Sequence, residues 1–271
     1  MTSVAREAEE LVRRFRTARR ASDVAVLEGF HALKHALRFD AHVVTAVTSD
    51  ADALELLAAE LAPDLREALL RIVEPVDEAV LARITPRAPR TAVVAVARRP
   101  RVAVAEALRN AQPSPVVLLE DPRDLGNVGA CVRVAAAADA AAVLTTGTSD
   151  PWHPDAVRGA AGLQYAVPVA RIDALPPSDR PLFAIDPDGD ELDPRRLPAR
   201  AILAFGTERS GLSEKLLRAA DARIRIPMRS GVSSLNLATS VAAVLFVRRL
   251  CDARERAPLQ LSAIDGRAQA M

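Results

Sequence analysis

The stretch Ile226-Pro-Met-Arg-Ser-Gly-Val-Ser-Ser-Leu-Asn-Leu-Ala-Thr-Ser-Val-Ala-Ala-Val-Leu-Phe246 joins a Pro-Met turn and a loop of small residues to an apolar helix expected to begin near Ser234. The first amides of a helix have no partner within it, and small residues let a ligand approach them closely. Ser234 and Asn236 add a hydroxyl and an amide at this point. The simpler interpretation is an N-cap, because Ser and Asn are preferred at that position. The segment predicts a capped helix, a binding loop, or both.

The composition limits the class of protein. A chain of 271 residues that is 50% hydrophobic can bury a sizeable core in one large or two ordinary domains. Its net charge of +1 gives no global signal for nucleic acid, although arginines cluster locally and Lys34 and Lys215 are the only lysines. Cys131 and Cys251 are too few for a disulfide framework and lack the spacing of metal ligands. The charged start and the absence of a run of about 18 apolar residues predict a cytoplasmic protein without a metal.

Residues 1–100 alternate between helical and strand-like patterns, which predicts a small α/β domain. The helices are expected at 7–20, 31–38, 51–61 and 77–83, and the strands at 24–27, 42–48, 71–73 and 91–97. Arg98-Arg-Pro-Arg101 and Asn110-Ala-Gln-Pro-Ser-Pro115 interrupt this alternation. A linker is therefore expected over residues 101–114.

Residues 115–257 show a second alternation with nearly continuous apolar strands, as in a buried parallel sheet. The strands are expected at 116–120, 142–146, 167–169, 182–185, 201–205 and 223–226, and the helices at 128–138, 155–161, 213–220 and 234–249. Residues 258–271 show no pattern, and we expect a loose tail. The chain is thus predicted to be an α/β protein with two domains.

Three loops of the second domain follow a predicted strand and precede a helix, which is where open α/β sheets bind ligands. In the first, Asn127 can cap a helix and Arg133 lies within its next two turns. In the second, a glycine on each side flanks Glu208, and Ser213 can cap the following helix. The third is the stretch 226–236. Taken singly, the arginine could be a surface residue and the glutamate a solvated loop residue.

Taken together, the three loops resemble a known family. The spacing Asn127-x-Gly129-x-x-x-Arg133, then Gly206-x-Glu208-x-x-Gly211, then Ile226-Pro-Met228 leading to Ser234-Leu-Asn236, is similar to the three motifs of the SpoU/TrmH family of RNA ribose 2′-O-methyltransferases in the SPOUT superfamily. The segment 150–157 also resembles a part of that family, so the likeness covers residues 116–250.

The resemblance implies a SPOUT domain with a deep trefoil knot that binds S-adenosyl-L-methionine and works as a homodimer. The residues that it implies for the cofactor are Thr145, Thr146, Gly147, Phe205, Gly206, Thr207, Glu208, Gly211, Ile226, Met228, Ser234, Leu235 and Asn236. Those that it implies for catalysis are Arg133, Asn127, Glu208, Ser234 and Asn236, with Asn127 and Arg133 supplied by the partner subunit. Since a guanidinium keeps its proton in proteins, Arg133 is expected to bind a phosphate and to stabilise the developing alkoxide, while the proton acceptor stays open.

The N-terminal part, with Glu28-Gly29 and several arginines, resembles the ribosomal-protein-like domain with which related enzymes bind their substrate. Arg13, Arg14, Arg19 and Arg20 are candidates for RNA contact, or alternatively form a solvated helix face. The expected substrate is 23S ribosomal RNA, with transfer RNA as the alternative and an antibiotic-resistance role left open. The rival interpretations are a non-catalytic RNA-binding module of this fold and a Rossmann-type methyltransferase, whose glycine-rich first loop is not found here.

Overall fold

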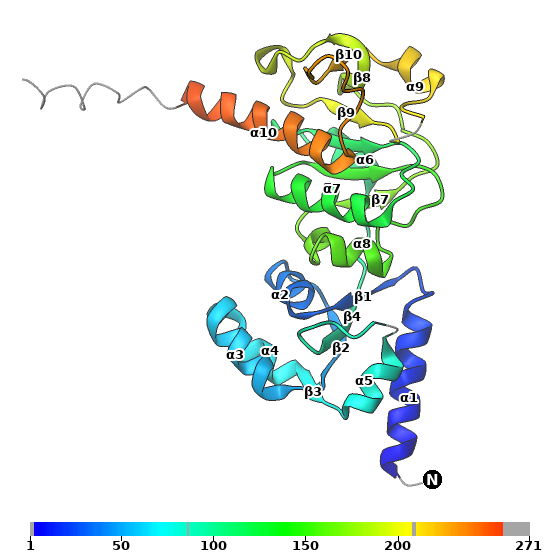
Figure 1. Cartoon of the computed structure of the whole chain (residues 1–271), viewed down its shortest axis with the longest axis vertical. Coiled ribbons are helices and arrows are strands. Elements are labelled where there is room, and N and C mark those ends of the chain that lie inside the picture. Colours follow the sequence, from blue (N-terminus) through cyan, green and yellow to red (C-terminus); the bar gives the residue numbers. More distant parts are fainter. Residues whose placement is uncertain (1–2, 86, 208–209, 257–271) are drawn as a thin grey trace, which may run out of the picture.

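The computed structural model describes residues 3–85, 87–207 and 210–256. Two sheets divide these residues into an N-terminal unit, residues 3–98, and a C-terminal unit, residues 104–256 (Figure 1). The chain is an α/β protein, as predicted, although the knot and the exact boundaries between the units stay predictions.

The N-terminal unit is built on a four-stranded sheet in the order β1-β4-β2-β3. Its strands are β1 (Val24–Glu28), β2 (Val43–Thr48), β3 (Val73–Pro75) and β4 (Val93–Arg98), and its helices are α1 (Ser3–Ala18), α2 (Phe30–Arg38), α3 (Ala51–Leu61), α4 (Arg66–Ile72) and α5 (Glu78–Ile84), with a single 3₁₀ turn, η1 (Pro63–Leu65), before α4. The strand expected at 71–73 was wrong in part, because Arg71 and Ile72 end α4 and the strand begins at Val73.

Alternation along β4 explains why helices cover both faces of this sheet. Successive side chains of a strand point to opposite faces. Val94 and Val96 pack in one apolar cluster with Phe15 of α1, whereas Val93 and Ala95 pack in another with residues of α2, α3 and α4. Every residue of β4 before Arg98 is therefore buried.

The C-terminal unit is built on a parallel sheet of six strands in the order β10-β8-β9-β5-β6-β7. The strands are β5 (Val116–Leu119), β6 (Ala142–Thr145), β7 (Val169–Arg171), β8 (Leu182–Glu191), β9 (Ile202–Phe205) and β10 (Ala222–Arg225). The helices are α6 (Val104–Arg109), α7 (Leu125–Ala137), α8 (Pro154–Gly159), α9 (Glu214–Ala219) and α10 (Leu237–Arg256), with 3₁₀ turns η2 (Leu163–Tyr165) and η3 (Pro194–Arg196). Strands β5, β6 and β9 are buried throughout, as their continuous apolar character predicts.

Two expectations about helices need correction. The segment expected to be a linker contains α6, whose Leu108 is buried against the sheet. The last helix begins at Leu237 and not at Ser234. Although α10 spans 20 residues, no helix among the described residues has the length and apolar character that a membrane span requires.

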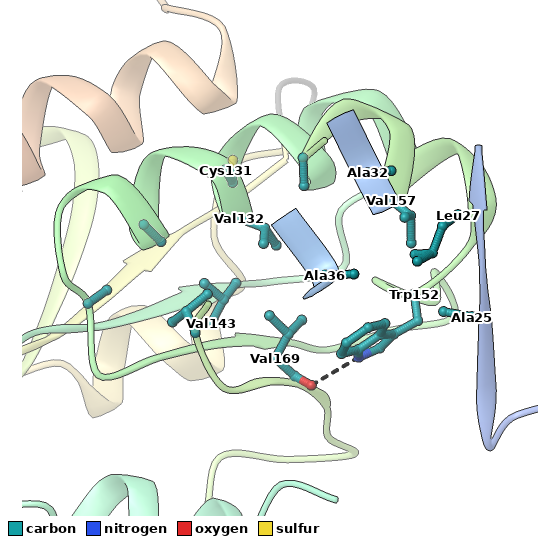
Figure 2. Close-up of a cluster of buried hydrophobic side chains, with 14 of the residues drawn as sticks. Ala25, Leu27, Ala32, Ala36, Cys131, Val132, Val143, Trp152, Val157 and Val169 are labelled. Atoms are coloured by element: carbon teal, nitrogen blue, oxygen red, sulfur yellow. Dashed lines mark hydrogen bonds between the residues drawn. The ribbon is translucent and has the colours of Figure 1, made fainter. Parts of the chain in front are cut away.

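The two units share one apolar cluster (Figure 2). Ala32 and Ala36 of α2 lie in the same cluster as Cys131 and Val132 of α7. Gly162 allows this close approach, because a Cβ atom there would lie 2.4 Å from the carbonyl oxygen of Ala32. The packing of α2 against the C-terminal unit is therefore tight at the level of the backbone.

Polar contacts join the units around this apolar cluster. The guanidinium of Arg99 pairs with Asp150 at 2.8 Å, and Nδ1 of His35 lies 2.7 Å from the carbonyl oxygen of Ala161. Both contacts connect residues of the N-terminal sheet unit, or the segment just after it, to the C-terminal unit. The relative position of α2 and α8 is thereby fixed by directional bonds as well as by packing.

Glu28 is the carboxylate at the centre of the junction between the units. Its side chain is only 2% exposed and accepts hydrogen bonds from Arg19 at 2.6 Å, from the hydroxyl of Thr85 at 2.9 Å, and from Arg158 of α8. Burial alone raises the pKa of Glu28, but the bonds from Arg158, Arg19 and Thr85 outweigh burial, so the pKa lies below its ordinary value. The carboxylate is therefore ionised at neutral pH and holds three segments together.

We expect Glu28→Gln to lower the free energy of unfolding by about 1 to 3 kcal/mol, because it leaves buried donors without a charged acceptor. The stabilisation is complete at neutral pH and is lost as the pH falls below 4.5, through the lower folded pKa. Urea unfolding between pH 7 and pH 3 measures this difference. The matched control is Glu55→Gln, whose exposed pair with Arg66 should contribute less than about 1 kcal/mol; equal losses in both variants would contradict the role of Glu28.

Candidate functional site

A cavity of about 270 Å³ opens at the carboxyl ends of β9 and β10 and beside the middle of β8. It thus lies where parallel strands end, which is the edge at which such sheets bind ligands. Its lining residues are Ile185, Asp186, Pro187, Phe205, Gly206, Thr207, Gly211, Ile226, Met228, Ser233, Ser234, Leu235, Leu237 and Ser240. The structure thus brings together residues from the second and third sequence motifs.

Sequence reasoning missed the contribution of β8 to this cavity. Ile185, Asp186 and Pro187 line it, and Asp186 also accepts a hydrogen bond from Arg223 at 2.9 Å. The signal was present, because Ile185 was expected to end a strand and strand ends meet at one edge of a parallel sheet. Ser233, Leu237 and Ser240 were missed as well, since only part of the last loop was assigned to the pocket.

The loop after β9 folds tightly back on itself beside the cavity. Thr207 and Gly211 exchange two backbone hydrogen bonds of 3.2 and 3.0 Å. A Cβ atom on Gly206 would lie 2.1 Å from the backbone carbon of Gly211, so no larger residue fits at 206 without moving the loop. The expectation for Glu208 falls outside the described residues.

Ser213 closes this loop and starts α9. Its hydroxyl accepts a hydrogen bond from the amide of Leu216 at 3.2 Å, which confirms it as the cap of that helix. Its own amide and hydroxyl each donate to the carboxylate of Glu120 at 2.6 Å. Glu120, which sequence reasoning did not single out, therefore ties the end of β5 to the loop after β9.

The first and third motifs meet at a pair of asparagines. The side-chain amide of Asn236 donates to Oδ1 of Asn127 across 2.9 Å, within one chain. Oδ1 of Asn236 accepts from the amides of Ala238 and Thr239 at 2.9 and 3.3 Å, so Asn236, not Ser234, caps α10. Ser234 is exposed and lines the cavity. Asn127 does not cap its own helix, because Asp124 does so by accepting from the amide of Asn127 at 2.7 Å.

Helix α7 presents Arg133 to solvent. Gly129, one turn earlier on the same face, lies where a Cβ would come within 2.2 Å of the carbonyl oxygen of Ala156, so α8 packs directly on the α7 backbone. Arg133 is exposed beyond that contact and does not line the cavity of its own chain. Its charge is one of the causes that lower the pKa of His31 on α2, after burial and the charge of Lys34.

The residues expected after β6 lie apart from the cavity. Thr145 is completely buried, the hydroxyl of Thr146 accepts from the amide of Asp121 at 3.0 Å, and Gly147 accepts from Arg171 at 3.2 Å. None of the three lines the cavity. Two strands, β5 and β9, separate β6 from β8 in the sheet. Their assignment to a cofactor stays a prediction.

The arginines of α1 have unequal environments. Arg13 and Arg14 line a groove of about 720 Å³ between α1 and the sheet, and Arg20 is exposed. Arg19, by contrast, is 20% exposed and bound to Glu28, so it stabilises the junction between the units. Three of the four candidates are therefore open to an anionic partner.

Two further candidates for ligand binding are a cluster of metal-binding residues and the side chain of Trp152. No group of three His, Cys, Asp or Glu residues suited to a metal ion is found in the described parts of the chain. Trp152 is 5% exposed and donates its indole N–H to the carbonyl of Val169 at 3.2 Å (Figure 2). Its ring also packs edge-on against Tyr165. It therefore belongs to the core.

With this geometry in view, known proteins identify the C-terminal unit. Residues 114–246 match the SpoU rRNA Methylase family. They form a SpoU methylase domain. The match includes the asparagine pair, Arg133 and most of the residues that line the cavity.

Similar proteins carry related names. Uncharacterized tRNA/rRNA methyltransferases of Mycobacterium bovis and Mycobacterium tuberculosis are 36% identical over 170 residues, 58% of this chain and 58% of theirs. The 23S rRNA (uridine(2479)-2′-O)-methyltransferase of Streptomyces viridochromogenes is 28% identical over 144 residues, 48% of this chain and 50% of that protein. The chain thus matches somewhat more than half the length of its mycobacterial relatives.

Solved structures extend the likeness beyond the SpoU methylase domain. An AdoMet-bound rRNA methyltransferase from Sinorhizobium meliloti superposes with a TM-score of 0.69 and 25% identity, over 92% of this chain and 95% of that one. The SpoU methyltransferase AviRb from Streptomyces viridochromogenes has a TM-score of 0.71 at 21% identity, over 90% of this chain and 99% of that one, which is a likeness of fold alone. The arrangement of both units is therefore shared with known folds.

We expect substitutions of Asn236 to separate its two roles. Asn236→Ala removes the cap and the bond to Asn127, and should lower the free energy of unfolding by about 1 kcal/mol. Asn236→Ser keeps a capping hydroxyl and loses only the bond to Asn127, so its stability should stay close to that of the wild type. Thermal unfolding of both variants measures the difference. A serine variant as unstable as the alanine variant would show that the asparagine pair, and not the cap, provides the stability.

Proposed function

We propose that this chain transfers a methyl group from S-adenosyl-L-methionine to a ribose 2′-hydroxyl of structured RNA, with 23S ribosomal RNA as the substrate. The observation that carries the proposal is the hydrogen bond between Asn127 and Asn236, which joins the first motif to the loop lining the cavity. The match to the SpoU rRNA Methylase family and the names of the relatives support the same reaction class.

The cavity fits such a cofactor in its chemistry. Phe205, Ile226 and Leu235 offer an apolar wall for an adenine ring, and Gly206 leaves the backbone open where the loop turns back. Asp186 adds a carboxylate that suits the positive charges of the cofactor. When bound, the cofactor supplies an electrophilic methyl group. The AdoMet-bound relative from Sinorhizobium meliloti supports this choice of cofactor.

The residues of this chain would then align the ribose. In the transfer, the 2′-oxygen would bond to the methyl carbon as the carbon–sulfur bond breaks with its electron pair left on sulfur, and the hydroxyl proton would pass to solvent. Holding two reactants in attack geometry can be worth about 7 to 11 kcal/mol, so positioning carries much of the acceleration. Arg133 keeps its proton, binds the neighbouring phosphate and stabilises the developing negative charge on the oxygen.

Because Arg133 does not line the cavity of its own chain, we propose a homodimer in which the partner subunit supplies this arginine. Asn236 and Asn127 then hold the loop at the boundary between the cavity and the incoming ribose. Glu208 and Ser234 retain their proposed roles in positioning, and the setting of the reaction is the cytoplasm. Gel filtration with light scattering measures the oligomeric state directly.

Two alternatives lead to different experimental outcomes. Transfer RNA is the second substrate, because several relatives are named tRNA/rRNA methyltransferases. A non-catalytic RNA-binding module would bind RNA without binding the cofactor. Mapping 2′-O-methyl groups in ribosomal and transfer RNA, from cells with and without the gene, distinguishes the two substrates. The same map reveals whether a single nucleotide of ribosomal RNA is modified, as in an antibiotic-resistance methylation.

We expect Gly206→Ala to weaken the binding of S-adenosyl-L-methionine at least tenfold, because its Cβ would meet the backbone of Gly211 at 2.1 Å. Isothermal titration measures the affinity, and circular dichroism verifies that the variant folds. Gly126→Ala is the matched control: it adds the same methyl group within α7, outside the cavity lining and at an ordinary helical φ, and its Cβ would meet only a side-chain oxygen of Asp124 at 3.1 Å. Equal affinity in the wild type and in Gly206→Ala would exclude the cavity as the cofactor site.

We expect Arg133→Ala to abolish methyl transfer while it leaves the affinity for S-adenosyl-L-methionine within a few fold, because Arg133 acts on the RNA and not on the cofactor. Transfer of a radiolabelled methyl group to an unmodified 23S ribosomal RNA transcript measures the reaction. Arg218→Ala, an exposed arginine on α9 paired weakly with Glu214, is the control. Full activity of Arg133→Ala would contradict the mechanism.

A further inference from the structure

Arg133 on α7 and Lys34 on α2 carry positive charges close to the junction between the units. Two nearby arginines lie in ion pairs, Arg38 with Asp64 and Arg158 with Glu28. No ion pair of Arg133 or Lys34 is found within residues 3–85, 87–207 and 210–256. Two cations that folding leaves unpaired are available to an anionic ligand.

The two cations lie on α2 and α7, two helices whose buried residues belong to one apolar cluster. On α7, Arg133 follows Gly129 by four residues, so both lie on the face that α8 contacts. On α2, His31 and His35 are also four residues apart, and His35 contacts the carbonyl of Ala161 just after α8. The chain after α8 then meets α2 at Gly162. The face of α2 that carries His31 and His35 is therefore joined to the C-terminal unit at residues 161–162, and the charge of Arg133 acts on His31 from α7.

The electrostatics agree with this placement. Burial, then the charge of Lys34, then the charge of Arg133 lower the pKa of His31, and no carboxylate raises it. Burial and Arg38 lower the pKa of Lys34, and only Asp64 opposes them. Asp64 is already held by Arg38 at 2.6 and 2.7 Å. The region is therefore positive, and bringing its cations together opposes folding unless a ligand compensates them.

We propose that Arg133, Lys34 and His31 form one binding surface for the phosphate backbone of RNA, which joins α7 to α2. We call it the α2–α7 surface. The inference rests on the proposed function and deepens it, since it assigns two positioning residues from the N-terminal unit to the substrate of the methylase domain. It differs from the groove of α1, which contains Arg13 and Arg14.

The three side chains suit consecutive phosphodiesters better than a protein carboxylate. A guanidinium offers a fork of donors, an ammonium a compact charge, and an imidazole a single N–H. Such donors, spread over two helices, match a chain of regularly spaced anions. Because Arg133 also contacts the reacting nucleotide in the proposed reaction, Lys34 and His31 would hold the neighbouring phosphates and set the position of the ribose. Their loss should then raise KM more than it lowers kcat.

The two lysines of this chain allow a direct test of contact. Lys34 lies on α2, near the middle of the molecule, and Lys215 lies on α9, at the top of the view in Figure 1. Acetylation by an amine-reactive ester, followed by mass spectrometry, compares the two lysines with and without an unmodified 23S ribosomal RNA transcript. We expect protection of Lys34 by at least fivefold and no change at Lys215. Equal reactivity of Lys34 with and without bound transcript overturns the α2–α7 surface.

Variants test the contribution to binding and to turnover. Lys34→Ala should weaken binding of the transcript about tenfold at low salt and reduce the slope of log affinity against log salt by about one. His31→Gln should raise KM severalfold with kcat within twofold. Lys215→Ala is the control and should match the wild type in affinity, salt slope, KM and kcat. Titration with S-adenosyl-L-methionine should be unchanged in every variant, which excludes misfolding as the cause.

The outcomes separate this surface from the proposed function. A chain that methylates the transcript normally after loss of both Lys34 and His31 overturns the surface and leaves the methyltransferase standing. A chain that binds the transcript through Lys34 and yet transfers no methyl group overturns the proposed function and leaves the surface standing. Protection of Lys34 by a synthetic acidic peptide as strong as that by the transcript would overturn the choice of RNA as the ligand.

Discussion

The register of the parallel sheet is the constraint on which the site depends. Phe205 of β9 lies opposite Leu119 of β5 and Ile185 of β8, and Leu119 lies opposite Thr145 of β6. Strands β5, β6 and β9 therefore end at the same level, whereas β8 passes this level and continues to Glu191. Polar and small residues that follow these strands are brought to one edge although they are up to about 90 positions apart in sequence, as the bonds from Ser213 to Glu120 illustrate.

This edge becomes a site because the segments beyond the strands are joined to each other. Glu120 holds the loop after β9, and Asn127 holds the loop after β10 through Asn236. Asn236 makes two kinds of contact, since its oxygen caps α10 while its amide reaches α7. The side chain of Asn236 thus determines where α10 begins, and it also holds the loop that lines the cavity. Serine at 234, which sequence reasoning favoured as the cap, stays open to the cavity.

The elements of the sheet were largely predictable because their signal is local. Continuous apolar runs such as Val116–Leu119 and Ile202–Phe205 leave little choice but a buried strand. The exact starts of helices were less predictable, since Asn236, Ser234 and Ser233 are all acceptable caps and only the tertiary bond to Asn127 distinguishes them. The role of Glu28 was not predictable, because its partners come from the turn after α1, from the segment after α5 and from α8. The sequence motifs predicted residues near the cavity, whereas the contribution of β8 could be recognised only from the order of the strands in the sheet.

The junction between the units gives the α2–α7 surface its physical basis. A binding surface divided between two mobile parts must lose conformational freedom when the ligand joins them, and that loss weakens binding. Here the buried carboxylate of Glu28, the pair of Arg99 with Asp150, and the close approach of Gly162 to Ala32 fix α2 against the methylase domain before any ligand arrives. The repulsion among the cations of the surface is therefore opposed by contacts that lie elsewhere in the junction. A phosphate backbone would meet a surface that is already formed, and its charges would be the partners that the folded chain does not provide.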